Sequence, residues 1–237
     1  GLLPGMNCGA CAYAGCALYA QAIVHKSAPI SLCVPGGQNT TETIANIMGS
    51  LASFTKPKVA FVRCQGNTQK AAINYEYHGI LECAQAIPYF QGPKHCEHSC
   101  LGLGTCFRAC PFGAIQMCSD MLVKILPEKC TGCGLCVKAC PRDVIQLVPY
   151  QEEPPIYQVA CLSTETALNT RKECQVGCIG CGLCVKKCPV SAITMKNNLA
   201  IIDYDLCIGC GDCAAVCPVK AILPLQKKKS ILSFKEE

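Results

Sequence analysis

Residues 178–189 read CIGCGLCVKKCP, and residues 207–218 read CIGCGDCAAVCP. Each stretch has the spacing C-x2-C-x2-C-x3-C-P, in which the first three cysteines hold one cubane iron-sulfur cluster and the fourth ligates the cluster of the other stretch. Glycines such as Gly180 and Gly209 let the backbone wrap closely around a cube. The spacing therefore predicts two [4Fe-4S] sites, one on Cys178, Cys181, Cys184 and Cys217 and the other on Cys207, Cys210, Cys213 and Cys188.

The composition is that of a metal-binding protein rather than a disulfide-rich secreted one. The 237 residues include 25 cysteines and no tryptophan, so the hydrophobic fraction of 51% overstates the apolar core. Clustered C-x2-C spacing without a signal peptide favours reduced thiolates bound to metal in a reducing compartment. Zinc is the alternative metal, but zinc sites rarely place eight cysteines in two such adjacent runs. We expect bound metal to replace part of the core.

The formal net charge of +5 does not predict nucleic-acid binding. A [4Fe-4S] centre in its 2+ state with four thiolates carries about two negative charges, so five centres would shift the balance to about −5. That shift removes the charge-based case for a nucleic-acid partner. No apolar run reaches the ~18 residues that a membrane-spanning helix needs, so we expect no membrane-spanning segment in this chain.

Residues 1–54 are expected to form a small N-terminal iron-sulfur domain. It contains four cysteines, the number that one [4Fe-4S] cluster needs: Cys8, Cys11, Cys16 and Cys33. The loop that holds the first three leads into a predicted helix over 14–26. Asn39 followed by Glu42 resembles a capping box and predicts the start of a second helix. The apolar stripe of that helix predicts packing within its own domain rather than on a partner, and it consists of Ile44, Ile47, Met48 and Leu51.

A first two-cluster module is predicted within residues 55–150. KPKVAFVRC over 56–64 is typical of a strand, and residues 69–89 have the apolar periodicity of a helix. The run at 130–141 is a regular ferredoxin half, whereas Leu103 replaces one cysteine of the run before it. We expect Cys96 to replace that ligand, and His95 and His98 to be surface residues, because imidazole ligation of cubanes is unusual. The predicted sets are Cys96, Cys100, Cys106 and Cys140, and Cys130, Cys133, Cys136 and Cys110.

A second module is predicted over 151–226, followed by a solvated tail over 227–237. It begins with a strand, IYQVAC at 156–161, that repeats the V-x-C ending of VAFVRC. In both units an isolated cysteine separates this strand from the ferredoxin run. If the two strands pair, four cysteines could meet and hold a sixth cluster, namely Cys64, Cys83, Cys161 and Cys174; buried free thiols are the alternative. Cys118 is then left over. We therefore expect five [4Fe-4S] clusters, with a sixth as an open possibility.

No substrate-converting motif accompanies the cysteines. The sequence contains no P-loop, no G-x-G-x-x-G after a strand, no nucleophile elbow and no HExxH. The residues therefore predict an α+β protein that carries single electrons through several low-potential centres, with no catalytic residues of its own.

Five stretches together resemble a known family, the long, multi-ferredoxin form of the B subunit of the Rnf complex. They are LPGMNCGACAYAGC (3–16), CVPGG (33–37), CLGLGTCFRACPFGAI (100–115), CTGCGLCVKACPRDVIQLVP (130–149) and CIGCGLCVKKCPVSAI (178–193). The first is the most discriminating, because generic ferredoxins lack it. Ala12 and Ala14 stand where the family usually has Gly and Pro, a departure that leaves the cysteines intact.

The resemblance implies a subunit of a membrane-bound ferredoxin:NAD+ oxidoreductase that couples electron flow to Na+ or H+ translocation. Reduced ferredoxin would be the donor, other subunits would handle flavin and NAD+, and the site of action would be the cytoplasmic face of the membrane. Family members begin with a membrane-spanning helix just before the LPG motif, which is not in this sequence. The alternative is a soluble polyferredoxin, or an electron-transfer subunit of a hydrogenase or carbon monoxide dehydrogenase assembly. A non-redox scaffold held by zinc or disulfides is a third class.

Overall fold

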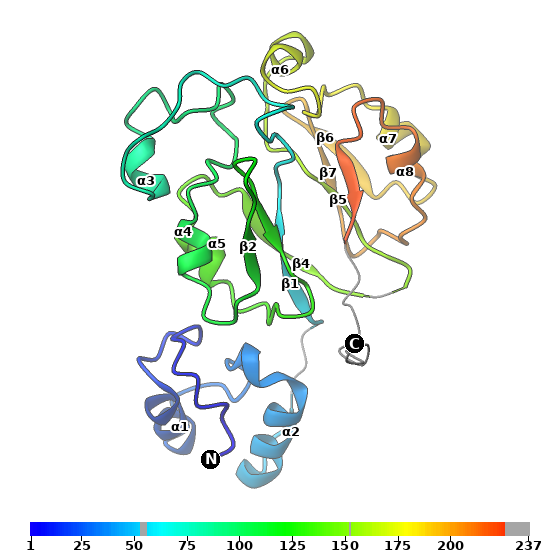
Figure 1. Cartoon of the computed structure of the whole chain (residues 1–237). Helices are drawn as coiled ribbons and strands as arrows, with labels where there is room; N and C mark the ends of the chain where they lie inside the picture. Colours follow the sequence, from blue (N-terminus) through cyan, green and yellow to red (C-terminus); the bar gives the residue numbers. More distant parts are fainter. Residues whose placement is uncertain (53–55, 152, 226–237) are drawn as a thin grey trace, which may run out of the picture.

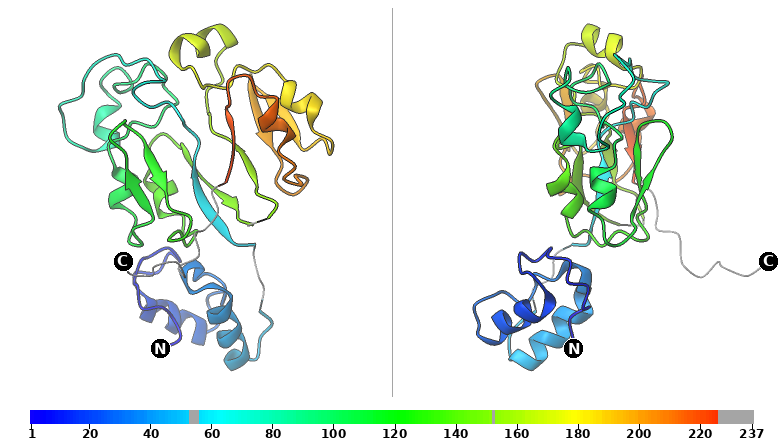
Figure 2. Two further views of the ribbon diagram at one scale, coloured as in Figure 1. Left: turned by 45° about the vertical axis from the view of Figure 1, so that its right-hand side comes forward. Right: turned by 60° about the vertical axis from the view of Figure 1, so that its left-hand side comes forward.

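The structure is a computed structural model that describes residues 1–52, 56–151 and 153–225. Its helices and strands are short and mixed, which confirms the predicted α+β class. An N-terminal helical unit is followed by two modules that lie side by side (Figures 1 and 2). The predicted boundary at residue 54 and the predicted tail over 227–237 lie outside the described residues. No helix in the described part of the chain is both long enough and apolar enough to span a bilayer.

The N-terminal unit is built on two α-helices and a short 3-10 helix. Helix α1 spans Cys16–Val24, the 3-10 helix η1 spans Val34–Gly36, and helix α2 spans Gly37–Met48. Its core consists of Tyr19, Ile23 and Ile44. Helix α1 is shorter than the predicted range because Gly15 before it is extended and Lys26 after it has a φ of 54°, in the left-handed region.

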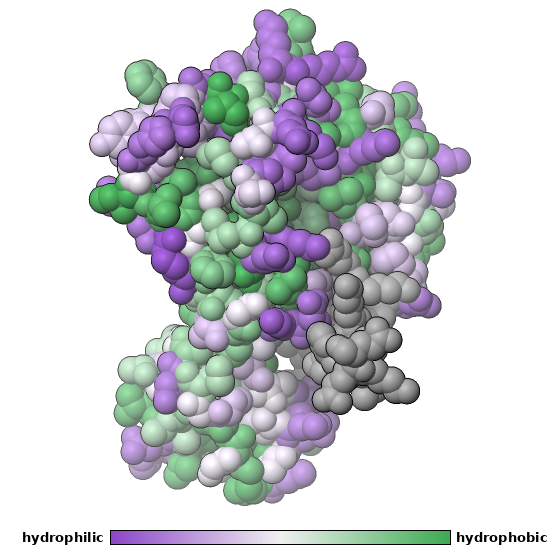
Figure 3. All heavy atoms as spheres, in the orientation of Figure 1, coloured by the Kyte–Doolittle hydropathy of each residue, from purple (hydrophilic) through white to green (hydrophobic). Residues whose placement is uncertain are grey.

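The capping-box prediction for α2 is wrong. The helix begins at Gly37, directly after the η1 turn, so Asn39 lies inside its first turn, and no side chain of the described residues caps it. The stripe prediction is only partly right. Ile44 is buried, but the helix ends at Met48, Ile47 is 69% exposed and Leu51 beyond the helix is 97% exposed. In Figure 3 hydrophobic side chains of this unit lie at the surface among hydrophilic ones.

The first module is a pair of two-stranded antiparallel sheets with two short helices. The first sheet joins β1 (Lys58–Val62) to β4 (Ile145–Pro149), with Ala60 opposite Leu147. The predicted strand at 56–64 is thereby confirmed. The second sheet is a hairpin that joins β2 (Ile115–Met117) to β3 (Val123–Ile125). The helices are α4 (Thr105–Arg108) and α5 (Leu135–Ala139), and both contain a cysteine of a ferredoxin run.

The second module has the same topology. One sheet joins β5 (Tyr157–Val159) to β8 (Ile222–Pro224), and the other is a hairpin that joins β6 (Ile193–Lys196) to β7 (Leu199–Ile202). Its helices are α6 (Ala167–Glu173), α7 (Leu183–Lys187) and α8 (Asp212–Ala215). In each module the strand before the first ferredoxin run pairs with the strand after the second run, and the hairpin lies between the runs.

The sequence-based hypothesis of a sixth cluster requires β1 to pair with β5, and the structure does not pair them. The contact region between the two modules, here called the seam, is made by other residues. Each strand pairs within its own module, and the side chain of Arg63 joins the two. Its Nε donates to the carbonyl of Val159 at 3.3 Å, and its Nη2 donates to the carbonyl of Cys161 at 3.1 Å. An apolar cluster completes the seam, and its buried members are Val59, Val148, Tyr150 and Leu225.

The predicted helix over 69–89 is wrong. The only helix there in the described chain is α3, which spans Cys83–Ala86. Residues before it are irregular and form isolated bridges, Ala71 with Cys174 and Ile73 with Lys94. The apolar spacing that looked helical belongs to a segment whose backbone hydrogen bonds go to other parts of the chain, such as the Ala72 amide to Glu173 at 2.8 Å.

Candidate metal centres

The regular run of the second module surrounds one cavity with four cysteines. Three belong to the loop and helix at 178–184 and the fourth follows α8; they are Cys178, Cys181, Cys184 and Cys217. Gly180, with a φ of 65°, brings the loop against the next hairpin: a methyl group there would approach the Asn198 carbonyl oxygen to 2.7 Å. Burial and the neighbouring Cys178 raise the pKa of the Cys184 thiol to about 11. The structure thus brings together the set predicted for this run.

The partner set of the second module is Cys207, Cys210, Cys213 and Cys188. Cys213 lies in α8, and burial with the neighbouring Cys207 and Cys210 raises the pKa of its thiol to about 11. The sulfur of Cys188 accepts a hydrogen bond from the Ala192 amide at 3.3 Å, and the Ala221 amide donates to Cys217 at the same distance. In the first module a different backbone group approaches a sulfur, because the Ala60 amide of β1 donates to Cys130, the first cysteine of its run, at 3.4 Å.

In the first module the regular run surrounds a second cavity. Its cysteines are Cys110, Cys130, Cys133 and Cys136, the set predicted for this run. Burial raises the pKa of the Cys136 thiol to about 12, with Cys130 and Cys133 acting in the same direction. Gly132 lies against β1, where a methyl group would meet the Lys58 carbonyl oxygen at 2.4 Å.

The altered run of the first module surrounds a third cavity, and here the structure departs from the sequence-based set. The cysteines that line the cavity are Cys83, Cys100, Cys106 and Cys140, so Cys83 takes the place predicted for Cys96. Helix α3 positions Cys83, whose amide donates to Thr105 Oγ1 of α4 at 2.8 Å. Leu103, which replaces the usual cysteine, is buried in an apolar cluster with Leu101 and Ala86.

Cys96 lies on a fourth cavity, at the seam. Its other cysteines are Cys64, Cys161 and Cys174, three of the four that the sequence groups for a sixth cluster. His98 is half-buried on the same cavity, whereas His95 is exposed. Cys118 lines none of the four cavities, and its amide bonds within the β2–β3 hairpin to Leu122. No local spacing points to the exchange of Cys83 and Cys96, because Cys83 belongs to no run.

The N-terminal unit gathers its own four cysteines. Burial raises the pKa of the Cys33 thiol, and the neighbouring Cys16, Cys11 and Cys8 act in the same direction. Asn7 Oδ1 accepts a hydrogen bond from the Cys16 amide at 2.8 Å and fixes the start of α1. The Tyr19 hydroxyl donates to the Pro29 carbonyl at 2.7 Å and accepts from the Leu32 amide at 3.0 Å, which holds the returning loop.

The donor sets fit cubane clusters. Each of the four cavities has four cysteines on its wall. Among the described residues no three His, Cys, Asp or Glu side chains converge as they would on a single ion. Zinc-bound sulfurs lie at about 2.3 Å from one ion, whereas cubane ligands surround a larger body, so a shared cavity is the relevant geometry. Binding as thiolates would release the protons that burial favours on these thiols.

Comparison with known families gives four matches along the chain. A model described as a putative Fe-S cluster matches residues 3–35, and one described as a 4Fe-4S dicluster domain matches residues 177–221. Two models described as 4Fe-4S binding domains match residues 123–146 and 96–114.

Whole-chain relatives are more specific. The chain is 47% identical over 206 residues to the B subunit of the proton-translocating ferredoxin:NAD(+) oxidoreductase complex of Clostridium ljungdahlii, covering 86% of this chain and 72% of the relative. The chain belongs to the family of Rnf B subunits. It is also 44% identical over 203 residues to the B subunit of the Na(+)-translocating ferredoxin:NAD(+) oxidoreductase complex of Acetobacterium woodii, covering 86% of this chain but 60% of the relative.

Membership of the Rnf B-subunit family together with the 4Fe-4S domains makes the chain an iron-sulfur electron-transfer protein. The domain matches leave out part of its cysteine chemistry, however. Cys64, Cys83, Cys161 and Cys174 lie outside all four matched ranges, yet each of them lines a cysteine-rich cavity.

Proposed function

We propose that the chain relays electrons one at a time from reduced ferredoxin to the flavin- and NAD-handling subunits of an Rnf complex. The observation that carries the proposal is the series of separate four-cysteine cavities within one chain of this family. We place the complex at the cytoplasmic face of the membrane, with ion translocation carried out by other subunits. Nucleic acid is not among the proposed partners.

Five clusters belong to this proposal. Their ligands are Cys8, Cys11, Cys16 and Cys33; Cys83, Cys100, Cys106 and Cys140; Cys130, Cys133, Cys136 and Cys110; Cys178, Cys181, Cys184 and Cys217; and Cys207, Cys210, Cys213 and Cys188. Compared with the sequence-based sets, Cys83 replaces Cys96 in the first module, because it lines the cavity of that set.

A bound [4Fe-4S] cluster would supply reversible one-electron transfer, and the residues around it would set its potential. Ala60, Ala192 and Ala221 donate backbone N–H groups to ligand sulfurs, which favours the more negative, reduced state. The apolar walls exclude water and act in the opposite direction, because they disfavour added charge. The difference between these two effects at each cavity would order the potentials along the chain.

The test is anaerobic purification from native membranes, followed by reduction. Visible absorbance that bleaches with reduced ferredoxin, together with co-isolation of flavin-bearing membrane subunits, is the expected result. A colourless protein with zinc in place of iron would refute the electron-transfer role. Isolation as a free protein that no flavin subunit accompanies would instead support a polyferredoxin.

A further inference from the structure

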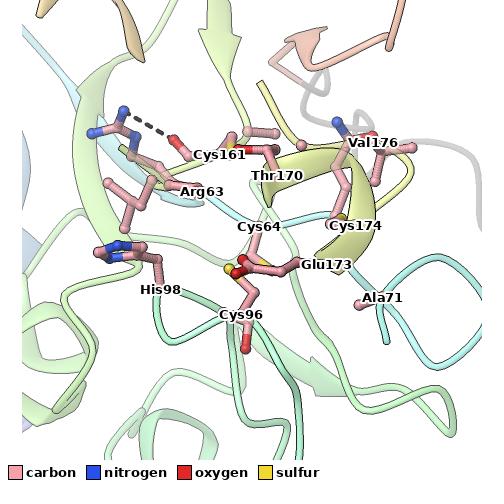
Figure 4. A pocket seen from close by; sticks show the side chains of 17 residues that line it. Arg63, Cys64, Ala71, Cys96, His98, Cys161, Thr170, Glu173, Cys174 and Val176 are labelled. Carbon is pink, nitrogen blue, oxygen red and sulfur yellow. Dashed lines mark hydrogen bonds between the residues drawn. The ribbon is translucent and has the colours of Figure 1, made fainter. Parts of the chain in front are cut away.

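The cavity at the seam has the cysteine content of a cluster site, and it is lined by residues of both modules. Its four cysteines come from segments far apart in sequence and lie around a common space (Figure 4). In this respect the seam cavity resembles the three cavities of the ferredoxin runs, each of which is also lined by four cysteines.

The repeat of the two modules positions two of these cysteines. Cys64 follows β1 and Cys161 follows β5, each two residues beyond the strand end. Arg63 holds them at the same place through its hydrogen bonds to the carbonyls of Val159 and Cys161, at 3.3 and 3.1 Å. The V-x-C endings thus meet across the seam although their strands do not pair.

Cys174 reaches the cavity from the end of α6. It forms a bridge with Ala71, and the adjacent Gln175 amide donates to the Lys70 carbonyl at 2.8 Å. Gly66 lies between two of the sulfurs, because a methyl group there would be 3.3 Å from Cys174 Sγ and 3.8 Å from Cys64 Sγ. Both sulfurs therefore flank the same small residue at the cavity wall.

The four cysteines are also withdrawn from solvent. Cys96 and Cys161 are buried, and Cys64 and Cys174 are half-buried. The ferredoxin runs combine the same two classes of burial, for example in buried Cys184 and half-buried Cys178.

We propose that Cys64, Cys96, Cys161 and Cys174 hold a sixth [4Fe-4S] cluster, which connects the two ferredoxin modules. The proposal rests on the electron-transfer function proposed above. It changes the sequence-based set in one position, with Cys96 in place of Cys83.

The position of this site suits an electron bridge. The Lys94 ammonium donates to the carbonyl of Gly66 at 2.6 Å, beside the seam cavity, and to that of Cys100 at 2.8 Å, in the first module. On the other side, Cys161 belongs to the buried cluster of the second module that contains Cys184, and Cys178 packs against this cluster. The cluster would accept one electron from a reduced neighbour, passing from the 2+ to the 1+ core, and then return it to the next cluster without making or breaking bonds to the protein.

The first measurement needs no substitution. Iron and acid-labile sulfide are determined on the full chain after anaerobic reconstitution, and we expect about 24 iron atoms per chain, four for each of six cubanes. A count of about 20 would overturn the sixth cluster and leave the proposed function intact. A protein without iron would refute both.

The second measurement asks which cysteines share a cluster. Cys96→Ser, Cys161→Ser and the double variant should each lose about four iron atoms, because all of them destroy one site. Cys83→Ser combined with Cys161→Ser should lose about eight, because those residues serve different sites. Cys118→Ser is the matched control and should lose none. A loss of about eight from the Cys96 and Cys161 double variant, or no loss from Cys161→Ser, would overturn the ligand set. If a variant fails to retain any cluster, the count on the unsubstituted chain decides.

Discussion

Two glycines of one ferredoxin run offer a matched test of how the cluster loop is held. Gly180 and Gly182 both have a positive φ, 65° and 69°. A methyl group at Gly180 would meet the Asn198 carbonyl oxygen at 2.7 Å and Asn198 Cα at 3.2 Å, whereas one at Gly182 would meet no atom of the described residues within 4 Å. Alanine at either site bears the left-handed backbone cost, about 1–2 kcal/mol. Only Gly180→Ala adds a clash with backbone, which costs about 1–3 kcal/mol more.

We expect Gly182→Ala to lower the free energy of unfolding by about 1–2 kcal/mol and Gly180→Ala by about 2–5 kcal/mol. With a guanidinium m-value of about 4 kcal/mol/M, the extra cost separates the apparent midpoints by about 0.3–0.7 M. The assay is anaerobic guanidinium unfolding followed by visible absorbance, at one fixed incubation time because cluster release makes unfolding irreversible. Equal midpoints for the two variants would refute the reasoning, since the backbone contact is the only difference between them.

Three further predictions follow from the other sites. Lys94→Met should destabilise the chain by about 1–3 kcal/mol for each carbonyl that it leaves without a partner, because the side chain is fully buried and donates to three carbonyls. The substitution should also lower the potentials of the adjacent clusters, because it removes a positive charge. Unchanged potentials in an EPR-monitored titration would contradict the second expectation. Cys83→Ser alone should lose about four iron atoms per chain, because it removes one ligand of a cluster. Full iron content in this variant would show that Cys83 is not a ligand. Anaerobic removal of iron with a chelator should abolish most ellipticity of the two modules, because thiolate-bound metal replaces much of their core; a native far-ultraviolet spectrum of the iron-free chain would speak against this.

The sequence was most informative where ligands are close together along the chain. The cysteines of the run at 178–184 were predicted to form one set with Cys217, and the structure places all four on one cavity. Short spacing makes such a prediction possible, because the loop itself positions three of the ligands. The strands that end in V-x-C were also recognisable, since their β-branched and aromatic residues favour extended backbone.

The sequence was less informative where a contact depends on tertiary structure. Local spacing favours Cys96, which lies beside the altered run, over Cys83, which belongs to no run. Only the placement of α3 against Thr105 shows that Cys83 lines the cavity of that run and that Cys96 lines the seam cavity. The segment over 69–89 had helical periodicity but bonds through its backbone to remote segments, which overrides a weak propensity. The joining of β1 to β5 by Arg63 was equally hidden, because a surface arginine and one that connects two modules look alike in sequence.

The seam cavity also bears on the order in which the protein is assembled. Cys64 and Cys96 belong to the first module and Cys161 and Cys174 to the second, so the cavity is divided between parts of the chain that are synthesised at different times. Domains generally fold as units during synthesis, the N-terminal one first. The first module can therefore take up its own clusters while the ribosome is still making the second. A cluster at the seam, as proposed above, has no complete site until Cys161 and Cys174 of the second module have joined Cys64 and Cys96, so its assembly depends on the docking of the two modules.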